Sequence, residues 1–263
     1  MVDWVSKNSY GFKDLVDIVR LLRSPGGCPW DMEQTHDSIR RNFLEETYEA
    51  VEAIDEKSSE HLKEELGDVL LQIVLHARME EEAGRFDMDG VADGICKKLI
   101  YRHPHVFAQT QVSGSEEVLK NWEALKRVEK SQETYTDTLN AVARSLPALW
   151  RAEKVQKKAA KAGFDWPDVT GALDKLTEEL EELKEAVAQG SNIEEELGDL
   201  LFAAVNVSRF VRKDPEDALN GATEKFIRRF ARVEALAAGR PMDQMGLEEL
   251  DRLWDQAKLE ETH

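Results

Sequence analysis

The sequence predicts an all-α protein built as two tandem bundles of four or five helices each. Apolar residues recur at the three- and four-residue intervals of amphipathic helices, and no segment alternates strictly between apolar and polar residues, as a half-buried strand does. Only seven prolines interrupt the 263 residues. A pattern of carboxylates also occurs twice, about half the chain apart, which indicates a duplicated helical unit.

In the first unit we expect five helices, each ended by a breaker or by a change of pattern. The first ends at residues 24–27 (SPGG) and the fourth at His103-Pro104, because these residues do not continue a helix. The five expected ranges are 15–22, 43–56, 62–84, 91–102 and 116–130.

The second unit has its own series of helices after a polar, aperiodic stretch. Residues 163–167 (GFDWP) and 190–192 (GSN) supply its first two stops. The expected ranges are 148–162, 169–189, 193–212, 215–238 and 247–261. We therefore divide the chain into an N-terminal repeat at 1–130, a linker at 131–144 and a C-terminal repeat at 145–263.

Composition narrows the class of protein. A net charge of −18 argues against a nucleic-acid-binding surface, since phosphate backbones attract basic patches. No stretch approaches the roughly 20 apolar residues of a membrane span. The first residues lack the basic and apolar regions of a signal peptide. Cys28 and Cys96 form neither a disulfide framework nor a metal-binding spacing, so we expect a cytoplasmic protein.

The repeated carboxylates are candidate ligands for a hard cation. Each copy has two pairs spaced three residues apart, namely Glu46/Glu49 and Glu65/Asp68 in the first half and Glu179/Glu182 and Glu196/Asp199 in the second. Residues three apart project from neighbouring positions on one helix face. If the helices on either side of residues 190–192 run antiparallel, the two pairs face each other and can hold one to three Mg²⁺ ions, with Mn²⁺ as the alternative.

The helices that follow the aspartates are expected to be buried. Residues 69–75 and 200–205 are apolar nearly all round, and such a helix normally lies in a core. Carboxylates that enter a buried helix are costly unless they are paired or bound to metal. Gly67 and Gly198 weaken these helices, which close packing against a neighbouring helix would justify.

Two further pairs recur after the acids. Lys98 and Arg102 correspond to Lys225 and Arg229, and Trp122 and Lys126 correspond to Trp254 and Lys258. One basic pair alone is typical of a solvated surface, and one tryptophan alone is more often a core residue. Their recurrence in the same order favours binding of phosphate oxygens and of a nucleobase.

These residues resemble the MazG family of nucleoside triphosphate pyrophosphohydrolases, whose signature is EExxE followed by ExxD. Residues 27–31 (GCPWD), 102–107 (RHPHVF), 163–166 (GFDW) and 225–230 (KFIRRF) also resemble the two-repeat bacterial members. The resemblance implies an all-α homodimer and Mg²⁺-dependent cleavage of ribo- and deoxyribonucleoside triphosphates between the α- and β-phosphates. The products would be a nucleoside monophosphate and pyrophosphate, and the role would be clearance of the nucleotide pool.

The resemblance also implies roles for particular residues. Glu179, Glu182, Glu196 and Asp199 would be the catalytic metal ligands, and the matching acids of the first half a second set. The residues that would bind the substrate, or assist from behind the ligands, are Lys175, Glu178, Asn192, Glu195, Asn206, Lys225, Arg229 and Trp254.

The second unit is the expected catalytic one. Alignment of the repeats places Asn42 opposite Lys175 and Leu75 opposite Asn206, so the first unit lacks a cation and an amide. We expect the first unit to contribute to structure, dimerisation or regulation.

Two other readings stay open at this point. The same four acids occur in all-α dUTPase-like and phosphoribosyl-ATP pyrophosphohydrolases, and a substrate panel would separate these. A non-enzymatic adaptor that uses acidic helix faces to bind partners is the other, and it predicts that the acids are dispensable.

Overall fold

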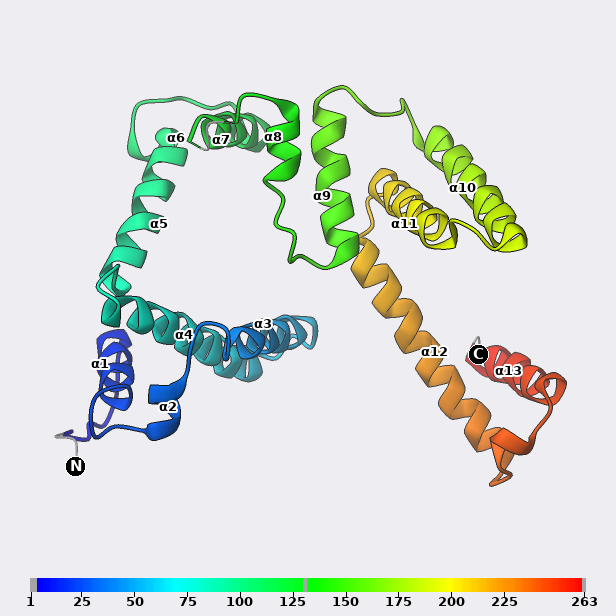
Figure 1. Ribbon diagram of the computed structural model, residues 1–263, viewed down its shortest axis with the longest axis horizontal. Coiled ribbons are helices and arrows are strands. Elements are labelled where there is room, and N and C mark those ends of the chain that lie inside the picture. The colour runs from blue at the N-terminus through cyan, green and yellow to red at the C-terminus, as the bar shows by residue number, and fades with distance from the viewer. Residues whose placement is uncertain (1–3, 130–131, 262–263) are drawn as a thin grey trace. The chain divides into compact units, whose positions relative to one another are not determined.

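The computed structural model describes residues 4–129 and 132–261, and these residues form α-helices and one short 3₁₀ helix, with no strand among them (Figure 1). The predicted all-α class is therefore confirmed. The chain divides into two compact units, residues 1–126 and 127–263. Within the described residues, no helix is long and apolar enough to cross a membrane.

The first unit contains two long helices that carry the acids, together with shorter helices on either side. Its helices are α1 (Phe12–Leu22), α2 (Pro29–Glu33), α3 (Arg40–Asp55), α4 (Ser59–Glu82), α5 (Met88–Arg102), α6 (Pro104–Phe107) and α7 (Ser115–Glu129), the last of which extends past the unit boundary. Helices α3 and α4 pack side by side, and α1 packs on α4 (Figure 1).

The second unit repeats the paired long helices. Its helices are α8 (Tyr135–Asn140), α9 (Ala148–Lys161), α10 (Val169–Gln189), α11 (Ile193–Phe210), α12 (Pro215–Ala237), η1 (Met242–Gln244) and α13 (Leu247–Glu261). Helices α10 and α11 pack together, and α12 packs against α13. Residues 131–144, where we expect a linker, include α8, whose first turn is closed by a capping box between Thr134 and Asp137.

The SPGG segment after α1 is a turn that demands glycine. A side chain on Gly27 would place its Cβ 2.3 Å from the carbonyl oxygens of Leu21 and Leu22. The backbone N–H of Cys28 donates to the carbonyl of Leu22 at 2.8 Å. The turn therefore folds back on the end of α1 and leads directly into α2.

The core of the first unit lies where α1 crosses α4. Val19, Val74, Leu75 and Met79 are buried there together with Ile39, which comes from the segment before α3. Burial of these aliphatic side chains stabilises the unit by roughly 2 kcal/mol each. This packing fixes α4, whose opposite end carries Glu65.

The turn between α10 and α11 brings the two acidic helices into an antiparallel pair. Gly190 ends α10 in the left-handed conformation at φ 67°, where glycine avoids steric strain. The N–H of Ser191 donates to the carbonyl of Ala186 at 3.1 Å, as in a Schellman-type cap. The predicted antiparallel arrangement is thus built by the local sequence.

The expected burial of residues 69–75 on α4 is confirmed, since all of them are buried or half-buried. Two other expectations about burial are wrong for the single chain. Leu201 and Phe202 on α11 are 51% and 45% exposed, although residues 200–205 are apolar nearly all round. A Cβ added at Gly67 or Gly198 would meet no atom within 4 Å, so neither glycine marks a close helix contact among the described residues. Leu201 and Phe202 are exposed because α11 packs chiefly on α9 and α10, which leaves one side of α11 uncovered.

Candidate metal centre

Three of the four predicted acids of the second unit converge. Glu179 of α10 and Glu196 and Asp199 of α11 each offer a carboxylate oxygen, and these oxygens lie within 4.8 Å of one another. Glu179 is only 5% exposed, whereas Glu196 is half-buried and Asp199 is exposed. The cluster therefore has a buried floor on α10 and an open side on α11, an arrangement that could hold a cation and still admit a ligand.

Glu182 lies beside this cluster rather than in the converging set. Loss of hydration and the nearby Glu179 carboxylate raise the pKa of Glu182 above its ordinary value. Glu196 contributes to the same shift. Glu182 thus interacts with Glu179 directly and with Glu196 through its charge, although it is not one of the three acids whose oxygens all lie within 4.8 Å of one another.

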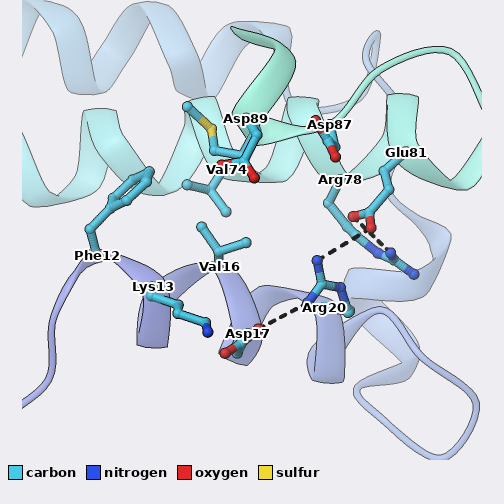
Figure 2. Close-up of a pocket in the computed structure, with 11 residues that line it drawn as sticks. Phe12, Lys13, Val16, Asp17, Arg20, Val74, Arg78, Glu81, Asp87 and Asp89 are labelled. Atoms are coloured by element: carbon cyan, nitrogen blue, oxygen red, sulfur yellow. Dashed lines mark hydrogen bonds and ion pairs between the residues drawn. The ribbon is translucent and has the colours of Figure 1, made fainter. Parts of the chain in front are cut away.

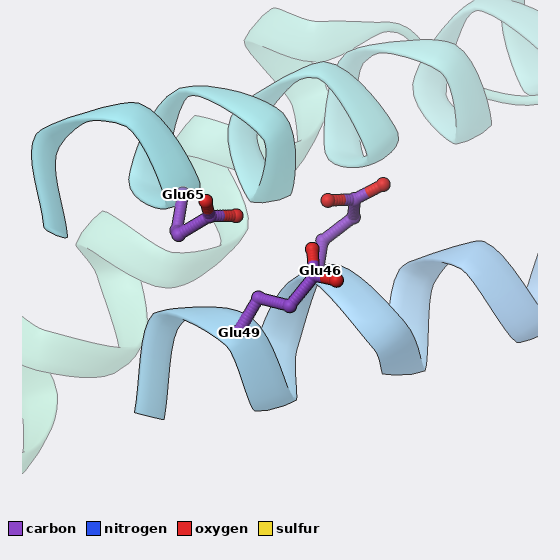
Figure 3. A group of neighbouring side chains, drawn as sticks. All are labelled: Glu46, Glu49 and Glu65. Atoms are coloured by element: carbon purple, nitrogen blue, oxygen red, sulfur yellow. The ribbon is translucent and has the colours of Figure 1, made fainter. Parts of the chain in front are cut away.

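The first unit builds a similar cluster with a different membership. Glu46 and Glu49 of α3 and Glu65 of α4 each offer a carboxylate oxygen, and these oxygens lie within 4.8 Å of one another. Figure 3 shows the three side chains between the two neighbouring helices. Asp68 is outside this set. Loss of hydration is the main cause that raises the pKa of Glu46, and the negative charge of Asp68 raises it further. The buried member is Glu65 here and Glu179 in the second unit, so the two copies are not equivalent.

A lysine already neutralises part of the second cluster. Lys175 Nζ lies 2.7 Å from Glu179 Oε1 and 2.8 Å from Glu178 Oε1. These hydrogen bonds, to Glu178 first, hold the pKa of Lys175 well above its ordinary value. The other oxygen of Glu179, Oε2, is buried and has no hydrogen-bond partner among the described residues.

The unpartnered oxygen indicates that the donor set suits a hard cation. A buried carboxylate oxygen without a partner is costly, and a divalent cation between Glu179, Glu196 and Asp199 would satisfy it. All the available donors are carboxylate oxygens, which Mg²⁺ prefers. The residues present therefore fit a hard divalent cation.

The first cluster has a histidine in place of the lysine. His61 Nε2 lies 3.2 Å from Glu65 Oε1, and its Nδ1 lies 2.8 Å from Glu56 Oε2. The hydrogen bond to Glu56 and the surrounding acids raise the pKa of His61. Sequence reasoning missed His61, although its position four residues before Glu65 on one helix was a usable signal.

The predicted phosphate and base contacts lie on another helix pair. Arg229 Nε is 2.7 Å from Glu261 Oε2, and the Arg229 guanidinium lies 5.9 Å from the centre of the Trp254 ring. The Phe226 ring packs against Trp254 at 5.1 Å. In the first unit Arg102 lies over Trp122 in the same way, at 5.3 Å. Each unit thus has a helix pair joined by an arginine–tryptophan contact, namely α5 and α7 in the first unit and α12 and α13 in the second.

The α12–α13 pair does not bond to the acids within one chain. Neither Lys225 nor Arg229 makes a hydrogen bond or ion pair with the α10–α11 carboxylates in the described part of the molecule. Helix α12 has few contacts with α11 and packs mainly on α13. In the described part of a single chain the acids therefore do not bond to the basic pair, and the substrate-binding roles of Lys225, Arg229 and Trp254 stay predictions.

The other candidate residues have separate positions. The Asn206 side-chain oxygen accepts hydrogen bonds from Arg209 Nε and Nη2 at 3.0 and 2.8 Å, and Arg209 also pairs with Asp165. Glu178 is held by Lys175. Asn192 begins α11 at φ 56° without a side-chain cap, and Glu195 is exposed. Asn206 is therefore engaged by its own helix, whereas Asn192 and Glu195 are accessible.

A cavity in the first unit is distinct from the acidic clusters. It has a volume of about 360 Å³ and lies between α1, α4 and the start of α5 (Figure 2). Arg20 pairs there with Asp17 and Glu81 at 2.9 and 3.3 Å, and Arg78 pairs with Glu81 at 2.9 Å. The two arginines in its wall are already paired, so we assign this cavity no role.

Comparison with known proteins agrees with the repeated acidic helices. The MazG nucleotide pyrophosphohydrolase domain matches residues 34–107 and 169–233, which include α3, α4, α10 and α11. Trp254 lies outside both matched segments.

Similar proteins cover nearly the whole chain. The nucleoside triphosphate pyrophosphohydrolase/pyrophosphatase MazG of Thermotoga maritima is 45% identical over 94% of this chain and 95% of its own length. The nucleoside triphosphate pyrophosphohydrolase of Escherichia coli is 44% identical over 94% and 97%. The uncharacterized protein YabN of Bacillus subtilis is 46% identical over 94% of this chain but 51% of its own length. Two domain matches and near full-length similarity place this chain in the MazG family.

Proposed function

We propose that this protein hydrolyses nucleoside triphosphates between the α- and β-phosphates, with release of a nucleoside monophosphate and pyrophosphate. The observation that carries the proposal is the convergence of Glu179, Glu196 and Asp199, and the buried, unpartnered Oε2 of Glu179 supports it. The similarity to named nucleoside triphosphate pyrophosphohydrolases over 94% of the chain supports the same activity.

We assign the cluster to Mg²⁺, with Mn²⁺ as a substitute. Glu179, Glu196 and Asp199 would hold the ion, and Glu182 would assist from the next turn of α10. When bound, such an ion supplies positive charge to phosphate oxygens and lowers the pKa of water. The open side of the cluster, at exposed Asp199 and Glu195, is where a triphosphate would enter.

The remaining residues of the chain would position and neutralise the substrate. Lys175 lies against Glu179 and would reach phosphate oxygens next to the cluster. Lys225 and Arg229 would neutralise the negative charge of the departing pyrophosphate, because fixed cations stabilise charge that develops during phosphoryl transfer. Trp254, whose ring already packs against Phe226, would contact the nucleobase.

We further propose that the protein is a homodimer. Leu173, Leu180 and Val187 of α10 are exposed apolar residues spaced seven apart, a pattern that packs against another helix. Leu201 and Phe202 of α11 are exposed as well, and we propose that all five side chains belong to one uncovered apolar surface. A second copy that covers this surface would also offer its own α12–α13 element to the acids, which the single chain does not bring together.

We assign catalysis to the second unit. Its cluster has Lys175, for which the first unit offers Asn42, and the first cluster is instead paired with His61. The first unit would then serve structure, assembly or regulation.

The direct test is an assay of products from a panel of ribo- and deoxyribonucleoside triphosphates, with Mg²⁺ and with excess chelator. We expect equal amounts of monophosphate and pyrophosphate with Mg²⁺ and none with chelator. Release of inorganic phosphate with a diphosphate product would contradict the proposed bond cleavage. Activity confined to dUTP would instead favour a dUTPase-like enzyme, and no turnover of any nucleotide would favour an adaptor.

A further inference from the structure

The ion pair between Lys175 and Glu179 is a feature of the site that its proposed chemistry does not require. A lysine four residues before a metal ligand could equally point to solvent. Instead its Nζ lies 2.7 Å from Glu179 Oε1, and Glu179 is the most buried acid of the cluster. The chain thus supplies a cation of its own to Glu179.

We propose that Lys175 is a built-in counter-cation, which a metal ion displaces from Glu179 and which then becomes available to the triphosphate. The inference rests on the proposed function and deepens it, because it states how metal binding and substrate binding are coupled. Lys175 acts here as a positioning residue that links the two events.

Electrostatics provides the first step of the argument. A divalent ion on Glu179 would stand next to the Lys175 ammonium, and two cations on one carboxylate repel each other strongly in a partly buried site. Glu179 Oε2 is the oxygen left without a partner, so the ion has a vacant donor from which to compete for the whole carboxylate. Binding of metal therefore weakens the hold of Glu179 on Lys175.

The structure also gives Lys175 somewhere to go. Its side chain is 36% exposed, and Glu178, which is mostly exposed, holds the same Nζ at 2.8 Å. Release from Glu179 thus leaves the ammonium at the rim of the cluster rather than in free solution. A phosphate oxygen that arrives at the rim would meet a lysine that has lost one of its two carboxylate partners.

The first unit lacks this arrangement. Asn42 takes the place of Lys175, and the side chain that pairs with the acids there is His61 on the other helix of the pair. Its partner Glu65 is the third acid of the pattern rather than the first. Displacement of a lysine toward a substrate is therefore a property of the second unit alone.

The test compares Lys175→Met with Lys184→Met in two equilibrium measurements without turnover. Lys184 is a matched control, because it lies on the same helix but pairs with Glu181, which is not part of the cluster. The Lys184 Nζ to Glu181 Oε1 distance is 2.7 Å. First, Mn²⁺ binding is measured by electron paramagnetic resonance without nucleotide. Second, binding of a triphosphate analogue with a methylene bridge between the α- and β-phosphates is measured at saturating Mn²⁺. The Mn²⁺ signal assigned to this cluster is the part of the wild-type signal that the Glu196→Gln variant lacks.

We expect opposite effects in the two measurements. Lys175→Met should bind Mn²⁺ about 5-fold more tightly and the analogue about 5-fold more weakly than the wild type, in the lower range of typical coupling between sites. Lys184→Met should change neither by more than about 2-fold. Weaker or unchanged Mn²⁺ binding in Lys175→Met would overturn the inference. Damage to the fold cannot imitate the expected result, since it would weaken the binding of both Mn²⁺ and the analogue. If wild type and Glu196→Gln bind Mn²⁺ equally, no Mn²⁺ signal depends on Glu196, and the proposed metal site itself is contradicted.

Discussion

At the scale of single residues, the acidic clusters carry an electrostatic cost when no metal is bound. Loss of hydration and the charges of Asp68 and Glu49 raise the pKa of Glu46 above 4.5. A carboxyl whose pKa is higher in the folded state than in the unfolded chain destabilises the fold at neutral pH. The penalty is absent below the unfolded pKa, where both states are protonated, and develops as the pH rises through the raised value.

This cost gives a pH-dependent prediction for Glu46→Gln. Without metal at pH 7, the variant should melt about 1–2 °C above the wild type, because it removes the repelled charge and keeps the shape. The gain should disappear below about pH 4.5, the ordinary pKa of the group. Thermal denaturation followed by circular dichroism measures both.

Glu45→Gln is the matched control for this experiment. It removes the same charge from the adjacent position, but Glu45 is exposed and pairs with Arg41 at 3.1 Å. We expect no gain in melting temperature from it. An equal gain in both variants would mean that net charge, rather than the cluster, is responsible.

The identity of the acids was predictable from the sequence, but their exact partnership was not. Glu179, Glu196 and Asp199 converge as expected, whereas Glu182 stands beside them. Residues three apart on a helix differ by about 60° in direction. Which of them meets the facing helix depends on how far one helix is shifted along the other, and a repeat pattern carries no information on that shift.

At the scale of elements, long helices were predicted well and short ones were missed. The ranges of α10 and α13 agree with the expected 169–189 and 247–261, and α10 ends at a strong stop, Gly190. Helices α2, α6 and α8 have four to six residues and are too short to show a period. Two of them begin with proline, which reads in sequence as a breaker but is favoured in the first turn.

The start of α10 offers a packing test at this scale. A Cβ on Gly171 would lie 2.2 Å from the Trp166 ring, so Trp166 must shift if Gly171 becomes alanine. We expect Gly171→Ala to lower the free energy of unfolding by about 1–3 kcal/mol, as overpacking does. Urea denaturation measures the change.

Gly221→Ala is the control for the packing test. A Cβ at Gly221, inside α12, meets no atom within 4 Å. Alanine there should raise the stability by up to about 1 kcal/mol through helix propensity. Equal effects of the two substitutions would show that Trp166 does not pack on α10 as described.

At the scale of the whole molecule, the uncovered apolar surface explains why burial was overestimated. The sequence shows that residues 200–205 are apolar, but not whether their own chain or a second copy covers them. In the single chain, Leu201 and Phe202 remain about half exposed. The prediction of burial was therefore wrong for one side of α11, and the proposed homodimer would cover that side.

The homodimer predicts the effect of a charge on α10. Val187 is 59% exposed, so Val187→Glu removes little packing within the chain but places a carboxylate in the proposed interface. Light scattering after size-exclusion chromatography should give twice the chain mass for the wild type and a lower mass for the variant. Ala188→Glu, at the next exposed position, should remain dimeric. A wild type of single-chain mass would contradict the homodimer.

The most direct test of the central claim compares matched substitutions in the two clusters. Glu196→Gln and Glu65→Gln change equivalent positions of the repeat, and pyrophosphate release from nucleoside triphosphates is measured with saturating Mg²⁺. We predict that Glu196→Gln loses activity by about 100-fold or more, since it removes a metal ligand. Glu65→Gln should retain most of the wild-type rate. Loss of activity in Glu65→Gln with an unaffected Glu196→Gln would contradict the assignment of catalysis to the second unit.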